Sequence, residues 1–369
     1  MELKNVTSFP FYFKLACVLF SVIAMGYLLI LGKEALSPMV FSCLFSILLL
    51  PLCNFFERKF KFPRSLASLI SVIILITAIS SILYLVGSQL KRLYSDWPQF
   101  ESQVETSIDT LQDWISKTFN IAQKKQNKYV DTATSKIISS GTEVVGATVL
   151  SLSSILLFMV FTFIYTFFFL LYRRLIMKFL ISVFLDENKN LVHDIMEQIQ
   201  YIIRKYIVGL LMEMGIVATG VSLTFWIIGV HYAILLGLIT GLFNIIPYIG
   251  IFTALIISCI ITFATATAVS KVFLVMIVLV ITHLIDSNII LPLVVGSKVR
   301  INALITVMGV IFGEMIWGVT GMFLSIPIIA VMKIIFDRIE SLKPWGIILG
   351  DEEKKQNELI EPVEMVDPS

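Results

Sequence analysis

The chain has 369 residues, of which 57% are hydrophobic and only 15% are charged. Soluble domains carry about 25% charged residues, so this composition excludes an ordinary water-soluble protein and predicts an all-α polytopic membrane protein. The 28 Lys and Arg against 26 Asp and Glu give a net charge of +2, which supplies no overall positive field for binding nucleic acid.

Apolar runs occur along most of the chain. A helix needs about 20 apolar residues to cross the roughly 30 Å hydrocarbon core of a bilayer. Runs of adequate length occupy residues 15–32, 35–56, 65–90 and 144–172, and a fifth run, 207–230, contains a single charge at Glu213. Residues 271–290 can span the membrane once more. These runs predict six helices that cross the bilayer.

Two further apolar regions are interrupted. Residues 232–270 carry no formal charge but contain Gly237, Gly241, Asn244, Pro247 and Gly250. Residues 302–337 divide near residues 318–321 into two pieces of roughly 16–18 residues each. Because a 16-residue helix is only about 24 Å long, each region predicts either a helical hairpin that enters and returns or a pair of short tilted spans.

Lysines and arginines in the short loops predict the orientation of the chain. The loop after the second run, FFERKFKFPRS, holds four basic residues, so it is expected on the cytoplasmic side. Counting crossings outward from it puts both termini in the cytoplasm and leaves Lys33 and Lys271 outside. Residues 351–369, with seven acidic and two basic side chains, are expected to form a disordered cytoplasmic tail.

The insertion between the third and fourth runs, residues 88–143, contains seven basic and seven acidic side chains and is expected outside the membrane. Asp96 is a candidate N-cap for a helix that begins there. The apolar stripe of that helix follows a period near 3.6 and consists of Leu93, Trp97, Phe100, Val104, Ile108, Leu111 and Ile115. The stripe favours packing within the chain, contact with a second subunit, or a helix lying on the lipid surface.

A second apolar stripe precedes the fifth run and predicts one continuous helix that passes from the cytoplasm into the membrane, with Asn190 as its candidate cap. The stripe consists of Leu191, Ile195, Ile199, Ile202 and Tyr206. The predicted organisation is three spans in residues 1–87, the helical insertion in 88–143, a span with amphipathic helices in 144–206, a transport core in 207–340 and the acidic tail in 341–369.

Common sequence motifs of enzyme active sites do not occur in the chain. It contains no HExxH, GxSxG, Walker loop or CxxC, and its three histidines, at positions 193, 231 and 283, lack the spacing of metal ligands. The sequence therefore predicts no enzymatic activity, no cofactor and no bound metal.

Ionisable residues at membrane depth usually face a cavity or a partner. Glu213, Asp286 and Glu314 are such residues, and each has the alternative of lying at an interface or a helix end. His283 lies three residues before Asp286, so the two side chains would share a helix face and could share a proton or a hydrogen bond. Alternatively, Asp286 caps a helix break before Pro292. Further amides stand at Asn244, Asn288 and Asn302.

A repeated spacing accompanies the interruptions. Gly241 precedes Pro247 by six residues, and Gly321 precedes Pro327 by six. Paired glycine and proline interruptions in two apolar segments indicate a transport site in secondary transporters. Chance is the competing explanation, because both residues are common in membrane helices.

Three longer segments, GLITGLFNIIPYIG (237–250), LIDSNIILPLVVGSKV (284–299) and FGEMIWGVTGMFLSIPIIAVMK (312–333), resemble the AI-2E family of autoinducer-2 exporter-like permeases. The resemblance covers nearly the whole chain and implies about eight membrane segments, a bacterial cell-membrane location and export of small solutes, with autoinducer-2 or sodium/proton antiport proposed among members. Glu314 departs from the family pattern, which puts transfer of autoinducer-2 specificity in doubt. The family motifs fall on Asn244, Pro247, Tyr248, Gly250, Asp286, Asn288, Pro292, Gly296, Gly318, Gly321 and Pro327.

Three functions follow from these features. The leading one is a secondary transporter that exports a small polar solute, with H⁺ or Na⁺ as the coupling ion. The others are a Na⁺/H⁺ antiporter and a non-transporting membrane scaffold. The expected partners are the lipid bilayer, the solute, the ion and further copies of the chain, but no nucleic acid. The predicted pathway residues are Glu213, Asn244, Pro247, Tyr248, Gly250, His283, Asp286, Asn288, Pro292 and Glu314. The predicted hinge and close-packing residues are Gly237, Gly241, Gly296, Gly313, Gly318, Gly321 and Pro327.

Overall fold

The computed structural model describes residues 10–96, 116, 154–184, 186–246, 249–265, 270–294 and 301–350. These residues contain α-helices and short 3-10 or π turns, with no strand among them. Seven of their helices are long and apolar enough to cross a membrane. The predicted all-α polytopic membrane fold is therefore confirmed. The predicted helix after Asp96, most of the insertion and residues 351–369 of the acidic tail lie outside the described residues. The first part of the predicted tail is helical, at Lys343–Leu349, and not disordered.

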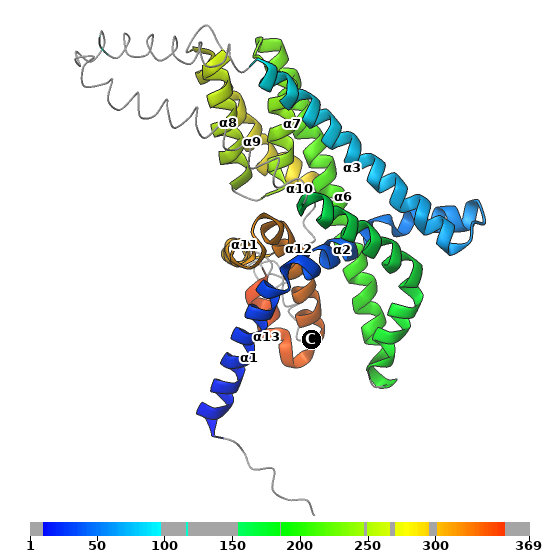
Figure 1. Ribbon diagram of the computed structural model, residues 1–369. Helices are drawn as coiled ribbons and strands as arrows, with labels where there is room; N and C mark the ends of the chain where they lie inside the picture. The colour runs from blue at the N-terminus through cyan, green and yellow to red at the C-terminus, as the bar shows by residue number, and fades with distance from the viewer. Residues whose placement is uncertain are drawn as a thin grey trace, which may run out of the picture.

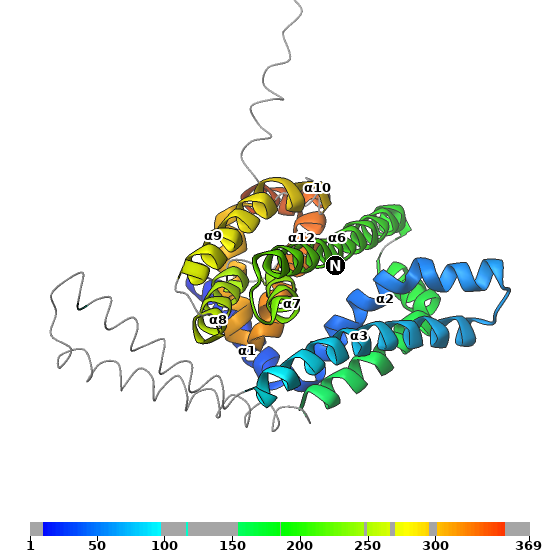
Figure 2. The ribbon, with the colours of Figure 1, turned by 90° about the horizontal axis from the view of Figure 1, so that it is seen from above.

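The turn between the second and third helices lies at the end of an arm that extends away from the other helices (Figures 1 and 2). Helix α1 (Phe11–Leu31) leads into α2 (Lys33–Lys59), which turns back into α3 (Arg64–Ser95), and the helix Ser154–Ser182 packs beside them. Buried apolar side chains join these last three helices, and they include Leu49, Cys53, Ala67, Val72, Leu75 and Leu170.

Helix α6 (Lys189–Ile228) has 40 residues and is about 60 Å long. It is the continuous helix that the second stripe predicts, although the residue before its first turn is Asn188 rather than Asn190, and no side chain caps it. Ile195, Ile199 and Tyr206 of the stripe are buried against Leu324 and Ile334. The apolar stripe occurs in the sequence because other helices cover one face of α6 along its length.

The first interrupted region is a helical hairpin. It contains α7 (Ala233–Asn244) and α8 (Ile249–Thr265), which pack against each other. With 12 residues, α7 is about 18 Å long and too short to cross the hydrocarbon core. The chain then continues as α9 (Ser270–Ile285), a π turn (Asp286–Ile290) and α10 (Leu291–Val294), which together form one helix of 25 residues. The alternative in which Asp286 caps a helix break before residues 288–292 is therefore wrong, because the helix continues through a π turn.

The second interrupted region is also a hairpin, and it breaks at Gly318, where φ is 65°. Helix α11 (Ala303–Trp317) has 15 residues and α12 (Val319–Arg338) has 20, so the two pieces are less equal than predicted, and α12 is long enough to span. Asn302 is the cap of α11, where its side-chain oxygen accepts a hydrogen bond from the Leu304 N–H at 2.9 Å.

A short 3-10 turn (Glu340–Leu342) and α13 (Lys343–Leu349) follow the second hairpin. Figure 1 places α7 and α8 in the upper part of the molecule and α11 and α12 in the lower part, with α6 running through both. Ile245, at the turn of the first hairpin, packs against the same cluster that holds Trp317 and Leu324 of the second hairpin. The turn of one hairpin therefore meets the body of the other beside α6.

Glycines allow these close helix contacts. A Cβ on Gly237 would lie 2.0 Å from Ser222 Oγ and 2.7 Å from the Ala218 carbonyl oxygen, and one on Gly241 would lie 2.6 Å from the Met214 carbonyl oxygen. Between α11 and α12, a Cβ on Gly321 would lie 1.9 Å from the carbonyl oxygen of Gly313. In each case the backbone of one helix occupies the space of a side chain on the other.

We expect Gly237→Ala to destabilise the protein by about 1–3 kcal/mol, because α6 and α7 must separate to admit the methyl group. Gly220→Ala is the matched control, since it adds the same methyl group to α6 with nothing within 4 Å. Thermal unfolding of both purified variants in detergent measures the difference. Equal melting temperatures for the two would show that the α6–α7 contact is looser than the structure has it.

Candidate functional site

Three polar side chains from different helices meet beside the turn of the first hairpin. Asn244 Nδ2 donates to Glu213 Oε1 at 2.8 Å and to Asp286 Oδ2 at 2.9 Å. Glu213 and Asp286 are 4% and 5% exposed, respectively. One amide group therefore bridges two buried carboxyl groups, and we call these three residues the carboxyl–amide site.

The fold places two members of the site at irregular points of the backbone, and the third, Glu213, within the long helix α6. Asn244 is the last residue of α7, and Asp286 is the first residue of the π turn after α9. Gly241 lets the end of α7 approach α6, where Glu213 lies. The turn itself also requires a glycine, because a Cβ on Gly250 would lie 1.8 Å from the Phe243 carbonyl oxygen.

The two carboxyl groups of the site lack hydrogen-bond partners for some of their oxygens and have no cation beside them among the described residues. The second oxygens, Glu213 Oε2 and Asp286 Oδ1, are buried and have no hydrogen-bond partner. No ion pair found in the described part of the chain involves either carboxyl group. Two carboxylates buried without a cation are strongly unfavourable. The arrangement is therefore suited to holding a proton between the two groups or a small cation against their free oxygens.

A metal ion at this position would find few protein ligands. Within the described ranges, no group of three or more His, Cys, Asp and Glu side chains lies close enough together to hold a metal. The oxygens of two carboxyl groups and one amide suit Na⁺ better than a transition metal. The carboxyl groups can also bind a proton or a water molecule.

Several predicted pathway residues do not join this site. The structure shows no hydrogen bond or ion pair between His283 and Asp286, and His283 Nδ1 is buried without a partner. Asn288 is exposed and donates to the Leu284 carbonyl oxygen at 2.8 Å. Glu314 is exposed on α11, and Pro292 is exposed on α10. Pro247, Tyr248 and Gly296 lie outside the described residues, and Pro327 is buried within α12.

Tyr232, in the turn between α6 and α7, forms a further polar contact. Its hydroxyl donates to Asp96 Oδ2 at 2.6 Å, and Asp96 follows the last residue of α3. Burial, together with the hydrogen bond and the negative charge of Asp96, raises the pKa of Tyr232 to about 12. The contact therefore ties the end of α3 to the start of the first hairpin while the phenol is neutral.

We expect Tyr232→Phe to lower stability at neutral pH by about 1 kcal/mol, the usual contribution of one hydrogen bond. Because the folded pKa lies above the unfolded value of about 10, the contribution is complete below pH 10 and is lost as the pH rises toward 12. Melting temperatures measured across this range should therefore fall more steeply for the wild type than for Tyr232→Phe. Tyr94→Phe, at an exposed tyrosine near the same end of α3, is the control, and a wild-type curve parallel to Tyr232→Phe would contradict the assignment.

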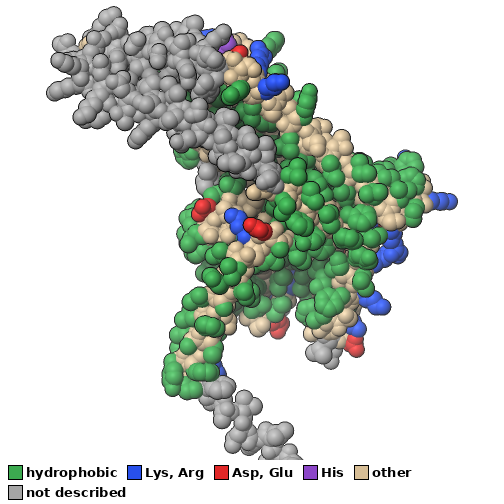
Figure 3. Space-filling model, viewed as in Figure 1, with side chains coloured by type: hydrophobic (Ala, Val, Ile, Leu, Met, Phe, Trp, Pro, Cys, Tyr) green, Lys and Arg blue, Asp and Glu red, His purple; other side chains and the backbone are tan. Residues whose placement is uncertain are grey.

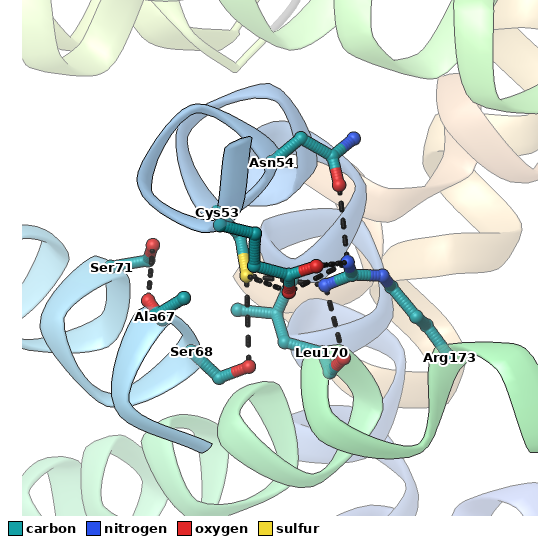
Figure 4. A network of polar contacts seen from close by, with 8 residues as sticks. Cys53, Asn54, Ala67, Ser68, Ser71, Leu170 and Arg173 are labelled. Atoms are coloured by element: carbon teal, nitrogen blue, oxygen red, sulfur yellow. Dashed lines mark hydrogen bonds and ion pairs between the residues drawn. The ribbon is translucent and has the colours of Figure 1, made fainter. Parts of the chain in front are cut away.

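A second, largely buried polar network lies in the arm, and it was not predicted (Figure 4). Arg173 Nη2 lies 2.8 Å from both oxygens of Glu57 and 3.1 Å from Asn54 Oδ1, and Nη1 lies 3.2 Å from Cys53 Sγ. Arg173 and Glu57 are 17% and 15% exposed in their side chains. Neither residue is among the predicted site residues. Their pairing across 116 positions leaves no local sequence signal.

Comparisons with known proteins agree with this architecture. The chain is 32% identical over 129 residues to YrrI of Bacillus subtilis, a match that spans 35% of this chain and only 36% of that protein. YueF of the same species, named as a candidate transport protein, is 25% identical over 322 residues, with 83% and 84% of the two chains covered. The AI-2 transport protein TqsA of Escherichia coli is 24% identical over 349 residues, with 90% and 96% covered. The family model for AI-2E family transporters matches residues 19–341. The chain is therefore a multi-pass membrane protein that belongs to the AI-2E transporter family.

Proposed function

We propose that the chain exports a small polar solute resembling autoinducer-2 and that an ion gradient drives the export through the carboxyl–amide site. The observation that carries the proposal is the pair of buried carboxyl groups bridged by Asn244, each with one oxygen lacking a partner. Ionisable groups at this depth are expensive for a membrane protein to maintain, and they are typical of ion pathways. Similarity along nearly the whole length of TqsA, which is named for AI-2 transport, supports the class of solute.

The position of the site supports alternating exposure. It lies where a helix end, a hairpin turn and a π turn meet, and such irregular backbone within a membrane protein is tolerated where it lines a cavity or a binding site. The two hairpins could move against α6 while the site stays near the middle of that helix. Protonation or cation binding would remove the repulsion between Glu213 and Asp286 and so favour one arrangement over another.

A Na⁺/H⁺ antiporter is the second candidate function. The same two unpartnered carboxyl oxygens favour it, because they could bind Na⁺ and H⁺ in competition. In this case no organic solute would be required.

The setting of the proposed transport is the cell membrane of a bacterium, with both termini in the cytoplasm and several copies of the chain in one assembly. The basic residues between α2 and α3 support this orientation. A cysteine placed at Ser65 in a cysteine-free background should then resist an impermeant thiol reagent added to intact cells. Labelling at that position would show that the proposed orientation is wrong.

Purified protein in liposomes tests the proposal. Labelled autoinducer-2 should accumulate when a pH or Na⁺ gradient is imposed, and it should not accumulate in protein-free liposomes. An internal pH change driven by Na⁺ without solute would instead establish the antiporter. If neither flux exceeds that of protein-free liposomes, the proposal is wrong for these substrates.

A further inference from the structure

Basic side chains gather at the outer end of the arm, where α2 turns into α3 (Figure 3). Four of them, Arg58, Lys59, Lys61 and Arg64, fall within seven positions and are exposed. Arg174 and Lys178 are exposed on the helix Ser154–Ser182, whose Arg173 is bound to Glu57 in the same end of the arm. We call these six residues the basic tip.

The basic tip keeps its full positive charge. Glu57 is the only acidic residue between positions 35 and 95, and both of its oxygens are bound to Arg173. Among the ion pairs formed by residues that the structure describes, none involves a member of the basic tip. Among the described residues, these six cations therefore have no ion-pair partner.

Aromatic rings stand directly beside these cations. Phe55, Phe56, Phe60 and Phe62 contact one another with ring centroids 5.7–6.4 Å apart. Phe55 and Phe60 are 45% and 51% exposed, and Lys59 Nζ lies 5.2 Å from the centroid of Phe55. An exposed aromatic cluster next to lysines fits the boundary between acyl chains and headgroups.

We propose that the basic tip and its phenylalanines bind an anionic phospholipid, with the phosphate against Lys59, Lys61 and Arg64 and the acyl chains against the exposed rings. Charge complementarity selects an anionic headgroup, and the adjoining apolar surface selects a lipid over a free anion. A cytoplasmic loop that is basic only because of the positive-inside rule would attract anionic lipids without a defined binding site. The Arg173–Glu57 ion pair instead joins the end of α2 to the helix Ser154–Ser182, which are the two helices that carry four of the six cations.

Native mass spectrometry of the purified full-length chain in detergent tests the proposal, with phosphatidylglycerol and phosphatidylcholine of matched acyl chains as the probes. Phosphatidylglycerol should bind at least about tenfold more tightly. In Lys59→Gln/Lys61→Gln/Arg64→Gln this preference should disappear, since each basic residue near an anionic surface contributes roughly fivefold. Lys14→Gln/Lys33→Gln/Lys91→Gln, which removes the same charge at exposed positions elsewhere, should keep the preference.

Two wild-type measurements keep the test decisive if the triple variant is unstable. Binding of phosphatidylglycerol should weaken as salt is raised toward about 1 M, where the screening length falls to about 3 Å, and inorganic phosphate should not displace the lipid at matched ionic strength. Equal binding of the two lipids would overturn the proposal, as would a preference that survives in the triple tip variant. Displacement by phosphate would show that the tip binds free anions instead of lipid.

Discussion

Asp286→Asn is expected to remove accumulation of solute driven by an ion gradient, with a fall of at least about tenfold, while the protein still folds and inserts. Asparagine keeps the shape of the side chain and can still pair with Asn244, but it can neither bind a proton nor attract a cation at neutral pH. Coupling free energies of about 1–3 kcal/mol correspond to factors of roughly 5–150, so loss of the coupling group should be large. Exchange of solute across the membrane without a gradient should continue.

Glu314→Gln is the matched control for this variant. It makes the same chemical change at an acidic residue that is exposed on α11 and is not part of the hydrogen bonds of the carboxyl–amide site. Initial rates in liposomes, normalised to protein content, separate the two variants. If Asp286→Asn accumulates solute as well as Glu314→Gln does, Asp286 is not the coupling group, and Glu213→Gln becomes the next variant to test.

Arg173→Met should lower the stability of the arm by about 3–5 kcal/mol, the usual effect of removing one partner of a buried ion pair. The substitution leaves the Glu57 carboxylate largely buried without its bidentate partner, and Asn54 and Cys53 lose their contacts as well. Methionine approximately preserves the packing of the aliphatic part of arginine. Thermal unfolding in detergent should therefore show a clear decrease in melting temperature.

Two further variants distinguish loss of the ion pair from loss of packing. Glu57→Gln/Arg173→Met removes both charges and should recover much of the lost stability, because replacing a whole buried pair is often nearly neutral. Arg174→Met changes the neighbouring exposed arginine and should alter stability by less than about 0.5 kcal/mol. A double variant as unstable as Arg173→Met alone would show that the network acts through packing rather than charge.

Much of the fold is visible in the sequence because it depends on local properties. The lengths of the apolar runs, the stripe along residues 191–206 and the glycine at position 318 each act within one or two helical turns. The interruption of residues 232–270 was likewise predictable, because Asn244 and Gly250 stand beside a turn. What the sequence did not determine was the relative length of the helices in each hairpin, since α12 continues through Pro327 without a break.

The candidate site was only partly predictable, because its members meet through tertiary packing. Three acidic residues stand in similarly apolar stretches of sequence. Glu213 and Asp286 are buried in the structure, whereas Glu314 is exposed. Helical spacing suggested that His283 would act with Asp286, but Asp286 instead pairs with Asn244, 42 positions away. The π turn that begins at Asp286 changes the register of the residues after it, and a regular helical projection cannot anticipate this.

The gradient at which net solute flux reverses tests the central claim most directly. In liposomes holding the wild-type protein, the solute concentration ratio at zero net flux should shift with the imposed pH or Na⁺ gradient. In Glu213→Gln/Asp286→Asn, zero flux should occur at equal solute concentrations whatever ion gradient is imposed. If the reversal point of this double variant still follows the ion gradient, the carboxyl–amide site does not couple transport to an ion.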